Sequence, residues 1–331
     1  MATSAPSPHT LSAPLKASQL KSDKHPDWCV GCGDFGITNA VQQALASMQL
    51  PPWEVYFFTG VGCSGKTSHY VQAYGAHTLH GRSLAFASGA KLANPHLTVL
   101  VAGGDGDGYG IGAGHFVHAG RRNLDMTYIV FDNEVYGLTK GQAAPTLPMG
   151  DQPKSLAAPH ITQPINPFAL ALTCGYTFIA RSYAYDAKHL KATIQKAIEH
   201  KGMALIDVLQ PCPTYNDLRT KEFFAEEVSF EGTKVPRVYY MEDEGYNGVV
   251  SNPHDADEVN AKRKEAFDKI YSQEERTGLG VYYQVELPTY HELLKQNMPV
   301  LRDCAPIDLQ YYDADMNPTT DLTSGWSALI V

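Results

Sequence analysis

The stretch Gly103-Gly104-Asp105-Gly106-Asp107-Gly108 and the later stretch Asp132-Asn133-Glu134-Val135-Tyr136-Gly137 decide the fold class of this chain. An apolar run over residues 97–102 leads into the first stretch, and another over 126–131 leads into the second. Each run is typical of a buried strand. The segment between them, residues 110–122, is long enough for a crossover helix, so the two strands are expected to be parallel.

Asp105 and Asn133 therefore follow the carboxyl ends of two strands and are expected at one edge of a sheet. The N-terminus of the crossover helix points at the same edge, where its N–H groups favour an anion. Magnesium prefers oxygen ligands, typically one or two carboxylates together with phosphate oxygens. A backbone carbonyl near Val135 can complete the protein's share. The pattern predicts a magnesium ion that holds a phosphorylated ligand.

Two other glycine-rich motifs are absent from this stretch. Between Gly103 and Gly141 no frame matches the dinucleotide pattern Gly-x-Gly-x-x-Gly. A calcium loop begins plausibly at Asp105-x-Asp107 but has Phe116 where the bidentate glutamate belongs.

Composition excludes several classes of function. The chain has 331 residues, is 44% apolar and carries a net charge of −9, which argues against nucleic acid as a partner. No apolar run approaches the length of a membrane span. Residues 1–24 lack a signal core and are expected to form a flexible arm. Nothing indicates export, so a cytoplasmic location is expected, with the six cysteines as reduced thiols or metal ligands.

Residues 25–218 alternate between strand and helix patterns, which predicts an α/β domain with a doubly wound, mostly parallel sheet. The expected helices cover residues 35–48, 83–92, 110–122, 167–174 and 186–200, and the expected strands cover 53–59, 97–102, 126–131, 176–180 and 203–209. Residues 145–166 are rich in proline and read as a long loop. Residues 219–331 form a C-terminal extension with a helix at 255–271 and a strand at 279–287. This extension either wraps the core or a partner subunit or is a plain addition.

Four cysteines fall in predicted loops. Cys29 and Cys32 form a Cys-x-x-Cys pair, Cys63 follows the strand at 53–59, and Cys212 follows the strand at 203–209. Four thiolates that converge at the ligand edge are able to hold a 4Fe–4S cluster or a structural zinc, and the pair alone is able to act as a redox couple. A zinc-binding scaffold without catalytic activity is one alternative reading. Cys174 and Cys304 are interpreted as structural.

Residues 60–67 match the phosphate-binding pattern Gly-x-x-x-x-Gly-Lys-Thr in full and follow a predicted strand. A P-loop nucleotidase is therefore an alternative of another class. Against it, residues 68–81 are polar and aromatic rather than an amphipathic helix, and the cysteines are left without a role.

The separation between Gly-Asp-Gly at 104–106 and Asn133 resembles the thiamine diphosphate motif. The fuller wording, at residues 104–112 and 132–142, resembles the β subunit of 2-oxoacid:ferredoxin oxidoreductases, and the similarity spans residues 27–216. It implies one 4Fe–4S cluster on Cys29, Cys32, Cys63 and Cys212, and Mg²⁺ on Asp105, Asn133 and Val135. It also implies substrate contacts from Lys66 and Lys140 and a cofactor or substrate contact from His80 or Arg82. The cofactor positions that it implies are Gly62, Cys63, Ser64, Ser88, Gly106, Asp107, Gly137 and Leu138.

The resemblance implies CoA-dependent oxidative decarboxylation of a 2-oxoacid, a reversible reaction with ferredoxin as the electron acceptor. The activating glutamate of thiamine enzymes has no counterpart in this chain, so an α subunit is expected to supply it. The wording Gly-Leu-Thr-Lys-Gly-Gln at residues 137–142 favours 2-oxoglutarate as substrate, with pyruvate or a branched-chain 2-oxoacid as alternatives.

Overall fold

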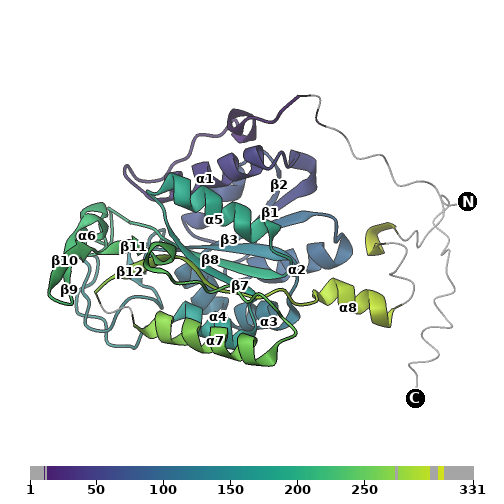
Figure 1. The fold of residues 1–331 in the computed structure, drawn as a ribbon. Coiled ribbons are helices and arrows are strands. Elements are labelled where there is room, and N and C mark those ends of the chain that lie inside the picture. Colours follow the sequence, from purple (N-terminus) through teal and green to yellow (C-terminus); the bar gives the residue numbers. More distant parts are fainter. Residues whose placement is uncertain (1–10, 12, 273–274, 299–304, 309–331) are drawn as a thin grey trace, which may run out of the picture.

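The computed structural model describes residues 11, 13–272, 275–298 and 305–308. Its main sheet is built from β1 (Val55–Thr59), β2 (Tyr74–His77), β3 (Thr98–Gly104), β4 (Met126–Asp132), β7 (Phe178–Tyr183), β8 (Met203–Leu209), β11 (Val238–Tyr240) and β12 (Thr277–Gln284). Within the described residues these eight strands lie in the order β11-β12-β7-β8-β4-β3-β1-β2 (Figure 1). Neighbouring strands are parallel except β12 and β7, which are antiparallel. The predicted mostly parallel sheet is confirmed.

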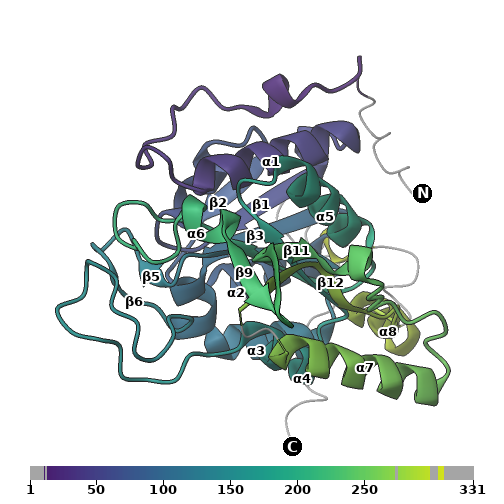
Figure 2. The same ribbon diagram turned by 60° about the vertical axis from the view of Figure 1, so that its left-hand side comes forward.

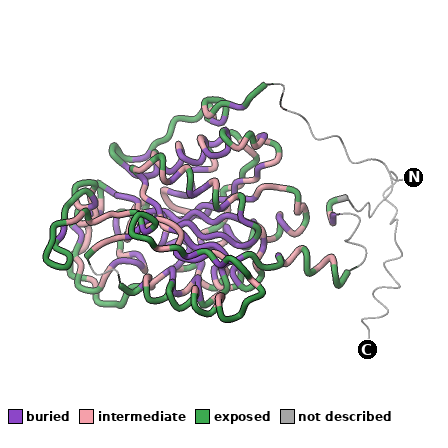
Figure 3. The backbone as a smooth tube through the Cα atoms, in the orientation of Figure 1, coloured by how far each residue is buried: buried purple, intermediate pink, exposed green. Residues whose placement is uncertain are grey.

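Helices cover both faces of the sheet, as Figure 1 shows. One face carries α1 (Asp34–Ser47) and α5 (Ala187–Glu199), and the other carries α2 (Ser83–Ala93), α3 (Ala113–Arg122), α4 (Pro167–Cys174) and α7 (Ala256–Tyr271). The central strands are mostly apolar on both sides because both of their faces are covered. Along β3, for example, Val99 and Val101 join the core beneath α3, while Leu100 and Ala102 join the core beneath α1. The buried tube in the middle of Figure 3 is this sheet.

Helix boundaries follow local chemistry that the sequence already shows. The Asp186 side chain accepts a hydrogen bond from the His189 N–H and caps α5, and the Asp255 side chain caps α7 in the same way. Pro167 occupies the first turn of α4, where no N–H is needed. The predicted helices at 167–174, 186–200 and 255–271 are confirmed within a residue at either end.

The crossover between β3 and β4 differs from the prediction. One helix is expected over residues 110–122, but the chain turns immediately after Asp105 into a π-helical turn, η4 (Gly106–Ile111), before α3 begins. Glycine is required at two positions of this turn, because neighbouring rings leave no room for a side chain. A Cβ at Gly106 would lie 2.2 Å from the Tyr136 ring, and one at Gly108 would lie 2.1 Å from the Tyr128 hydroxyl. Wide turns of this kind are frequent at functional sites.

The segment after residue 218 contributes to the main sheet. β11 and β12 extend it at one edge, and α7 packs on the same face as α4. Before β11, the chain forms α6 (Lys221–Ala225) and a hairpin of β9 (Glu227–Phe230) and β10 (Thr233–Pro236). As Figure 2 shows, these elements lie at the end of the sheet that also carries the β5–β6 hairpin (Val135–Tyr136 and Gln142–Ala143). The chain continues into α8 (Tyr290–Asn297) and η6 (Pro306–Asp308). Cys304 lies outside the described residues.

The described part of the expected N-terminal arm packs against the body of the protein. η1 (Ala17–Leu20) lies beside α1, and Leu20 is completely buried in the core beneath that helix. The Gln72 N–H donates to the Leu20 carbonyl at 2.7 Å, and the Ser22 N–H donates to the Tyr70 carbonyl. Leu20 is therefore the anchor that holds residues 13–24 in place.

We predict that Leu20→Ala releases this segment while the rest of the fold survives. Removing a buried leucine side chain costs about 3 kcal/mol, so the population of the open segment rises roughly a hundredfold. Limited trypsin digestion should then cleave after Lys21 and Lys24 much faster than in the wild-type protein. Leu293→Ala, on the exposed side of α8, is the control and should leave cleavage unchanged. Equal cleavage rates in both variants would show that Leu20 does not anchor the segment.

Candidate functional site

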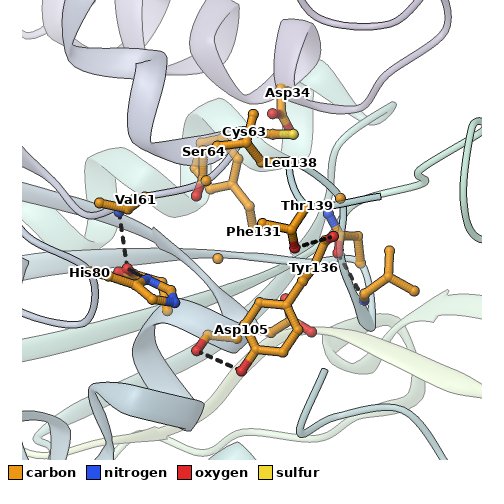
Figure 4. Close-up of a pocket in the computed structure, with 17 residues that line it drawn as sticks. Asp34, Val61, Cys63, Ser64, His80, Asp105, Phe131, Tyr136, Leu138 and Thr139 are labelled. Atoms are coloured by element: carbon orange, nitrogen blue, oxygen red, sulfur yellow. Dashed lines mark hydrogen bonds and ion pairs between the residues drawn. The ribbon is translucent and has the colours of Figure 1, made fainter. Parts of the chain in front are cut away.

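A pocket with about 570 Å³ of space between atoms, part of it open to solvent, lies at the carboxyl edge of β1, β3 and β4. Loops that follow these three strands meet there (Figure 4). The lining residues are Asp34, Val61, Gly62, Cys63, Ser64, His80, Gly104, Asp105, Gly106, Asp107, Phe131, Asn133, Val135, Tyr136, Gly137, Leu138 and Thr139. The predicted magnesium ligands Asp105, Asn133 and Val135 thus line the same pocket as Cys63.

Asp105 lies on the floor of this pocket and is held by Thr146, which comes from the long loop after β6. The Thr146 hydroxyl lies 2.6 Å from Asp105 Oδ2 and 2.8 Å from Asp132 Oδ1. A hydroxyl has one proton to donate, so one of the two carboxyls must carry a proton of its own. Burial raises the pKa of Asp105 to about 6 and raises that of Asp132 well above its ordinary value, with the Asp207 charge adding to the rise. Asp132 is therefore the protonated partner, and Asp105 is left to carry the negative charge.

Asn133 is held by hydrogen bonds on both sides of its carboxamide. Its Nδ2 donates to Gln210 Oε1 at 2.6 Å, and its Oδ1 accepts from the Val135 N–H at 3.0 Å. The second lone pair of Oδ1 remains for a ligand. Glu134, between Asn133 and Val135, has a positive φ of 63°, so the chain turns sharply there and brings both neighbours to the pocket.

Asp107 ties the loops of the pocket together. Its Oδ1 accepts from the Val61 N–H at 3.0 Å and the Gly81 N–H at 2.8 Å, and it lies 2.6 Å from His80 Nδ1. The carboxylate sits so close to Gly60 that a Cβ there would lie 1.9 Å from Asp107 Oδ2. A single carboxylate after β3 thereby fixes the loops that follow β1 and β2, and it brings His80 to the pocket wall.

The four cysteines of the sequence prediction are all free, and Cys63 lines the pocket. The sulfurs of Cys63 and Cys212 lie 3.5 and 3.7 Å from the position that a Cβ at Gly137 would take. The Cys32 sulfur accepts a hydrogen bond from Gln210 Nε2 at 3.3 Å, and the Cys32 N–H donates to the Cys29 carbonyl. The Trp28 indole N–H donates to the Cys63 carbonyl at 2.8 Å, so the Trp28 side chain lies against the loop that carries Cys63.

Burial controls the charge of these thiols. It raises the pKa of Cys63 to about 12 and also raises the pKa values of Cys32 and Cys212; the negative charge of Asp34 adds to each rise. Asp34 itself is buried beside the Cys32 thiol, and burial raises its pKa to about 7. Without a metal the three thiols are therefore protonated, and any metal that binds must displace their protons.

Other predicted site residues lie outside the pocket lining. Lys66 forms an ion pair with Asp27 at 3.0 Å, and Lys140 is exposed with a positive φ of 83° directly after the lining residue Thr139. Ser88 lies on α2 and donates to the Leu84 carbonyl, and Arg82 donates to the Ile111 carbonyl.

The P-loop alternative does not match the geometry of residues 60–67. A P-loop directs free backbone N–H groups at phosphate and continues into an α-helix. Here the N–H groups of Gly60, Gly65 and Lys66 donate to backbone carbonyls, and a 3₁₀ helix, η3 (Ser64–His69), follows. In the part of the chain that the structure describes, no three His, Cys, Asp or Glu side chains converge closely enough to hold a single metal ion.

Several residues of this site do not appear among the sequence predictions, among them Asp34, Tyr136, Thr146 and Gln210. Gln210 directly follows β8, just as Asn133 directly follows β4, so its position at the end of a strand was an available signal. Thr146 had no such signal, because it comes from an irregular loop.

Two family models match the chain in succession. The model described as thiamine pyrophosphate enzyme, C-terminal TPP binding domain, matches residues 60–208. The model that describes the C-terminal part of the pyruvate ferredoxin oxidoreductase beta subunit matches residues 212–298.

None of the described helices combines the length and apolar character needed to cross a bilayer.

Relatives with known names cover nearly the whole chain. The 2-oxoacid:ferredoxin oxidoreductase subunit beta of a Sulfolobus species is 53% identical over 85% of this chain and 89% of its own length. The 2-oxoglutarate oxidoreductase subunit KorB of Mycobacterium tuberculosis is 34% identical over 90% of this chain and 85% of its own. A solved 2-oxoglutarate:ferredoxin oxidoreductase from Magnetococcus marinus, with 2-oxoglutarate, coenzyme A and succinyl-CoA bound, superposes with a TM-score of 0.79 at 31% identity and 98% coverage of both chains. The chain belongs to the family of 2-oxoacid:ferredoxin oxidoreductase β subunits.

Proposed function

We propose that this β subunit binds thiamine diphosphate through Mg²⁺, holds a 4Fe–4S cluster, and oxidatively decarboxylates a 2-oxoacid to acyl-CoA and CO₂. The reaction is reversible, its preferred substrate is 2-oxoglutarate, and ferredoxin takes the electrons. The observation that carries the proposal is the position of Cys63, which lines the same pocket as Asp105 and Asn133. A cofactor that releases electrons and a cluster that accepts them have to be close together, and one pocket wall serves both.

The oxygen donors of the pocket suit Mg²⁺ and a diphosphate. Asp105 supplies a carboxylate, Asn133 a carboxamide oxygen and Val135 a backbone carbonyl, and phosphate oxygens complete an octahedron around the ion. Thiamine diphosphate supplies the electron sink that decarboxylation of a 2-oxoacid requires. The protein's own residues prepare the site: Thr146 and Gln210 fix the two side-chain ligands, and the absence of a side chain at Gly106 lets the Tyr136 ring pack against the turn.

The cysteines suit an iron–sulfur cube better than a single ion. In a 4Fe–4S cluster each cysteine binds a different iron, so the sulfurs stand apart around the cube. Cys63 and Cys212 border the same point beside Gly137, and the Cys-x-x-Cys loop is tied to the Pro211 carbonyl by the Gly33 N–H. The cluster accepts single electrons from the neighbouring pocket. Its need for a reducing compartment supports a cytoplasmic location.

Substrate choice is assigned to the loop after β5. Lys140 has a positive φ, a conformation that is costly for a residue with a side chain and that tends to persist where function requires it. Leu138 and Thr139, just before it, line the pocket, so we expect the Lys140 ammonium to reach the outer end of a bound ligand. A second carboxylate, as on 2-oxoglutarate, suits it, whereas pyruvate has none. The relatives named for 2-oxoglutarate support this choice.

An α subunit is part of the proposal. The family match on this chain covers the diphosphate-binding half of a thiamine site, and thiamine enzymes need a glutamate that activates the pyrimidine ring. We assign that glutamate, much of the coenzyme A pocket and the assembly as an αβ pair to the α subunit. A β chain that turned over 2-oxoacid alone would contradict this assignment.

Thr146→Val should weaken magnesium-dependent binding of thiamine diphosphate. The variant keeps the size of the side chain but removes the hydroxyl that holds Asp105, and loss of such a supporting contact costs about 10–100-fold in metal affinity. Titration calorimetry of the αβ complex with thiamine diphosphate at several Mg²⁺ concentrations measures this. Thr146→Ser keeps the hydroxyl and should bind as the wild type does. Equal affinities for the valine and wild-type proteins would refute the role of Thr146.

Cys212→Ser should lose the cluster. The wild-type complex is expected to contain about four iron atoms per β chain and to absorb visible light through sulfur-to-iron charge transfer. Iron analysis and the visible spectrum should both fall in the variant. Cys174→Ser, on α4 away from the other cysteines, is the matched control and should keep both. Zinc in place of iron in the wild-type protein would contradict the cluster.

Lys140→Met should affect 2-oxoglutarate more than pyruvate. A charge-assisted contact to the second carboxylate is worth about 1.5–3 kcal/mol, so kcat/KM for 2-oxoglutarate falls at least about tenfold while that for pyruvate changes little. Reduction of a viologen dye with each acid gives both values. Lys264→Met, on the exposed face of α7, is the control. Equal losses for the two acids would count against a carboxylate-pairing role.

A further inference from the structure

Gln210 touches both proposed centres of the site at once. It directly follows β8, is buried with 2% of its surface exposed, and receives its backbone position from a hydrogen bond to the Asp132 carbonyl at 2.8 Å. Its side-chain oxygen accepts from Asn133 Nδ2 at 2.6 Å. Its side-chain nitrogen donates to the Cys32 sulfur at 3.3 Å and to the Pro211 carbonyl at 2.8 Å. Every polar atom of the side chain is therefore used.

The surroundings permit only a narrow range of side-chain positions. A Cβ at Gly33 would lie 2.9 Å from Gln210 Cγ, so the glycine after Cys32 leaves the space that the glutamine fills. The Gly33 N–H in turn donates to the Pro211 carbonyl and holds the cysteine loop against the end of β8. The amide of Gln210 is therefore oriented before any ligand binds.

We propose that Gln210 is a positioning residue that couples the magnesium ligand Asn133 to the cluster ligand Cys32; this inference rests on the proposed function. The N–H···S contact stabilises negative charge on the Cys32 sulfur. Reduction of a 4Fe–4S cluster adds one electron and spreads the added charge onto its sulfurs, so a donor to one of them favours the reduced state and raises the reduction potential. The opposite end of the same amide keeps the Asn133 oxygen directed at the metal.

One side chain therefore influences both the cluster's reduction potential and the magnesium-dependent affinity for thiamine diphosphate. Different substitutions should change these two quantities separately. Gln210→Met fills the same space without a donor or an acceptor, and should lower the cluster's potential and weaken magnesium-dependent binding of thiamine diphosphate. Gln210→Glu, studied at alkaline pH with its carboxyl ionised, keeps an acceptor for Asn133 Nδ2 but has no proton for Cys32. It should lower the potential and retain cofactor binding.

The test uses the purified αβ holoenzyme. A redox titration with dithionite, followed by the paramagnetic signal of the reduced cluster, gives the midpoint potential, and calorimetry gives the affinity for thiamine diphosphate with Mg²⁺. We expect both Gln210 variants to shift the reduction equilibrium about tenfold toward the oxidised cluster, about 59 mV for one electron. Cofactor affinity should fall about 10–100-fold in Gln210→Met alone. Gln42→Met is the control, because Gln42 is also buried but donates to the Tyr70 backbone carbonyl.

A wild-type midpoint potential in Gln210→Glu would overturn the proposal, as would equal losses of both quantities in the two variants, which indicate a general packing defect. If Gln210→Met does not assemble, Gln210→Leu replaces it, because an uncharged variant without a donor decides the donor role, whereas the carboxylate of Gln210→Glu also lowers the potential by its charge. A wild-type complex without iron would instead contradict the proposed function, so the two failures are distinguishable.

Discussion

The parallel register of β3, β4 and β8 is the constraint on which the whole site depends. Gly104 pairs with Phe131, and Asp132 pairs with Leu209, so the three strands end almost level with one another. Asp105, Asn133 and Gln210 follow these ends directly and come together although up to about a hundred residues separate them in the chain. Parallel pairing places all carboxyl ends at the same edge, and antiparallel pairing would have divided these side chains between two edges.

Several carboxyl groups lie close together at this edge of the sheet and need to be stabilised there. Asp105, Asp107 and Asp207 are buried and Asp132 is half-buried, a concentration of carboxyls that costs free energy unless each is neutralised or paired. Each carboxyl is stabilised in a different way. Asp107 accepts hydrogen bonds from N–H groups of two loops, and Asp207 forms an ion pair with Arg181 and accepts a hydrogen bond from the Tyr109 hydroxyl. Asp132 keeps its proton. Asp105 lines the pocket beside Asn133, and a divalent cation is a suitable partner for its carboxylate.

Much of this arrangement was accessible from the sequence because it is encoded locally. The apolar runs before Asp105 and Asn133 predict the strands, and the parallel topology then predicts that both residues share an edge. The cysteines were assigned to the same edge by the same argument, and Cys63 does line the pocket with them. What the sequence could not show are contacts between irregular segments. Thr146 reaches Asp105 from a long loop, and the rings of Tyr128 and Tyr136 pack against the glycines of the π-helical turn after Asp105, contacts that no local pattern reveals.

We propose that the metal site and the iron–sulfur cluster are immediate neighbours along one edge of the sheet. The most direct test is to load the αβ complex with Mn²⁺ in place of Mg²⁺, reduce the cluster, and measure its paramagnetic resonance. The account predicts that Mn²⁺ strongly broadens the cluster signal and speeds its relaxation relative to the Mg²⁺ enzyme, because the dipolar interaction acts over a short distance. Identical signals with bound Mn²⁺ and with Mg²⁺ would contradict it.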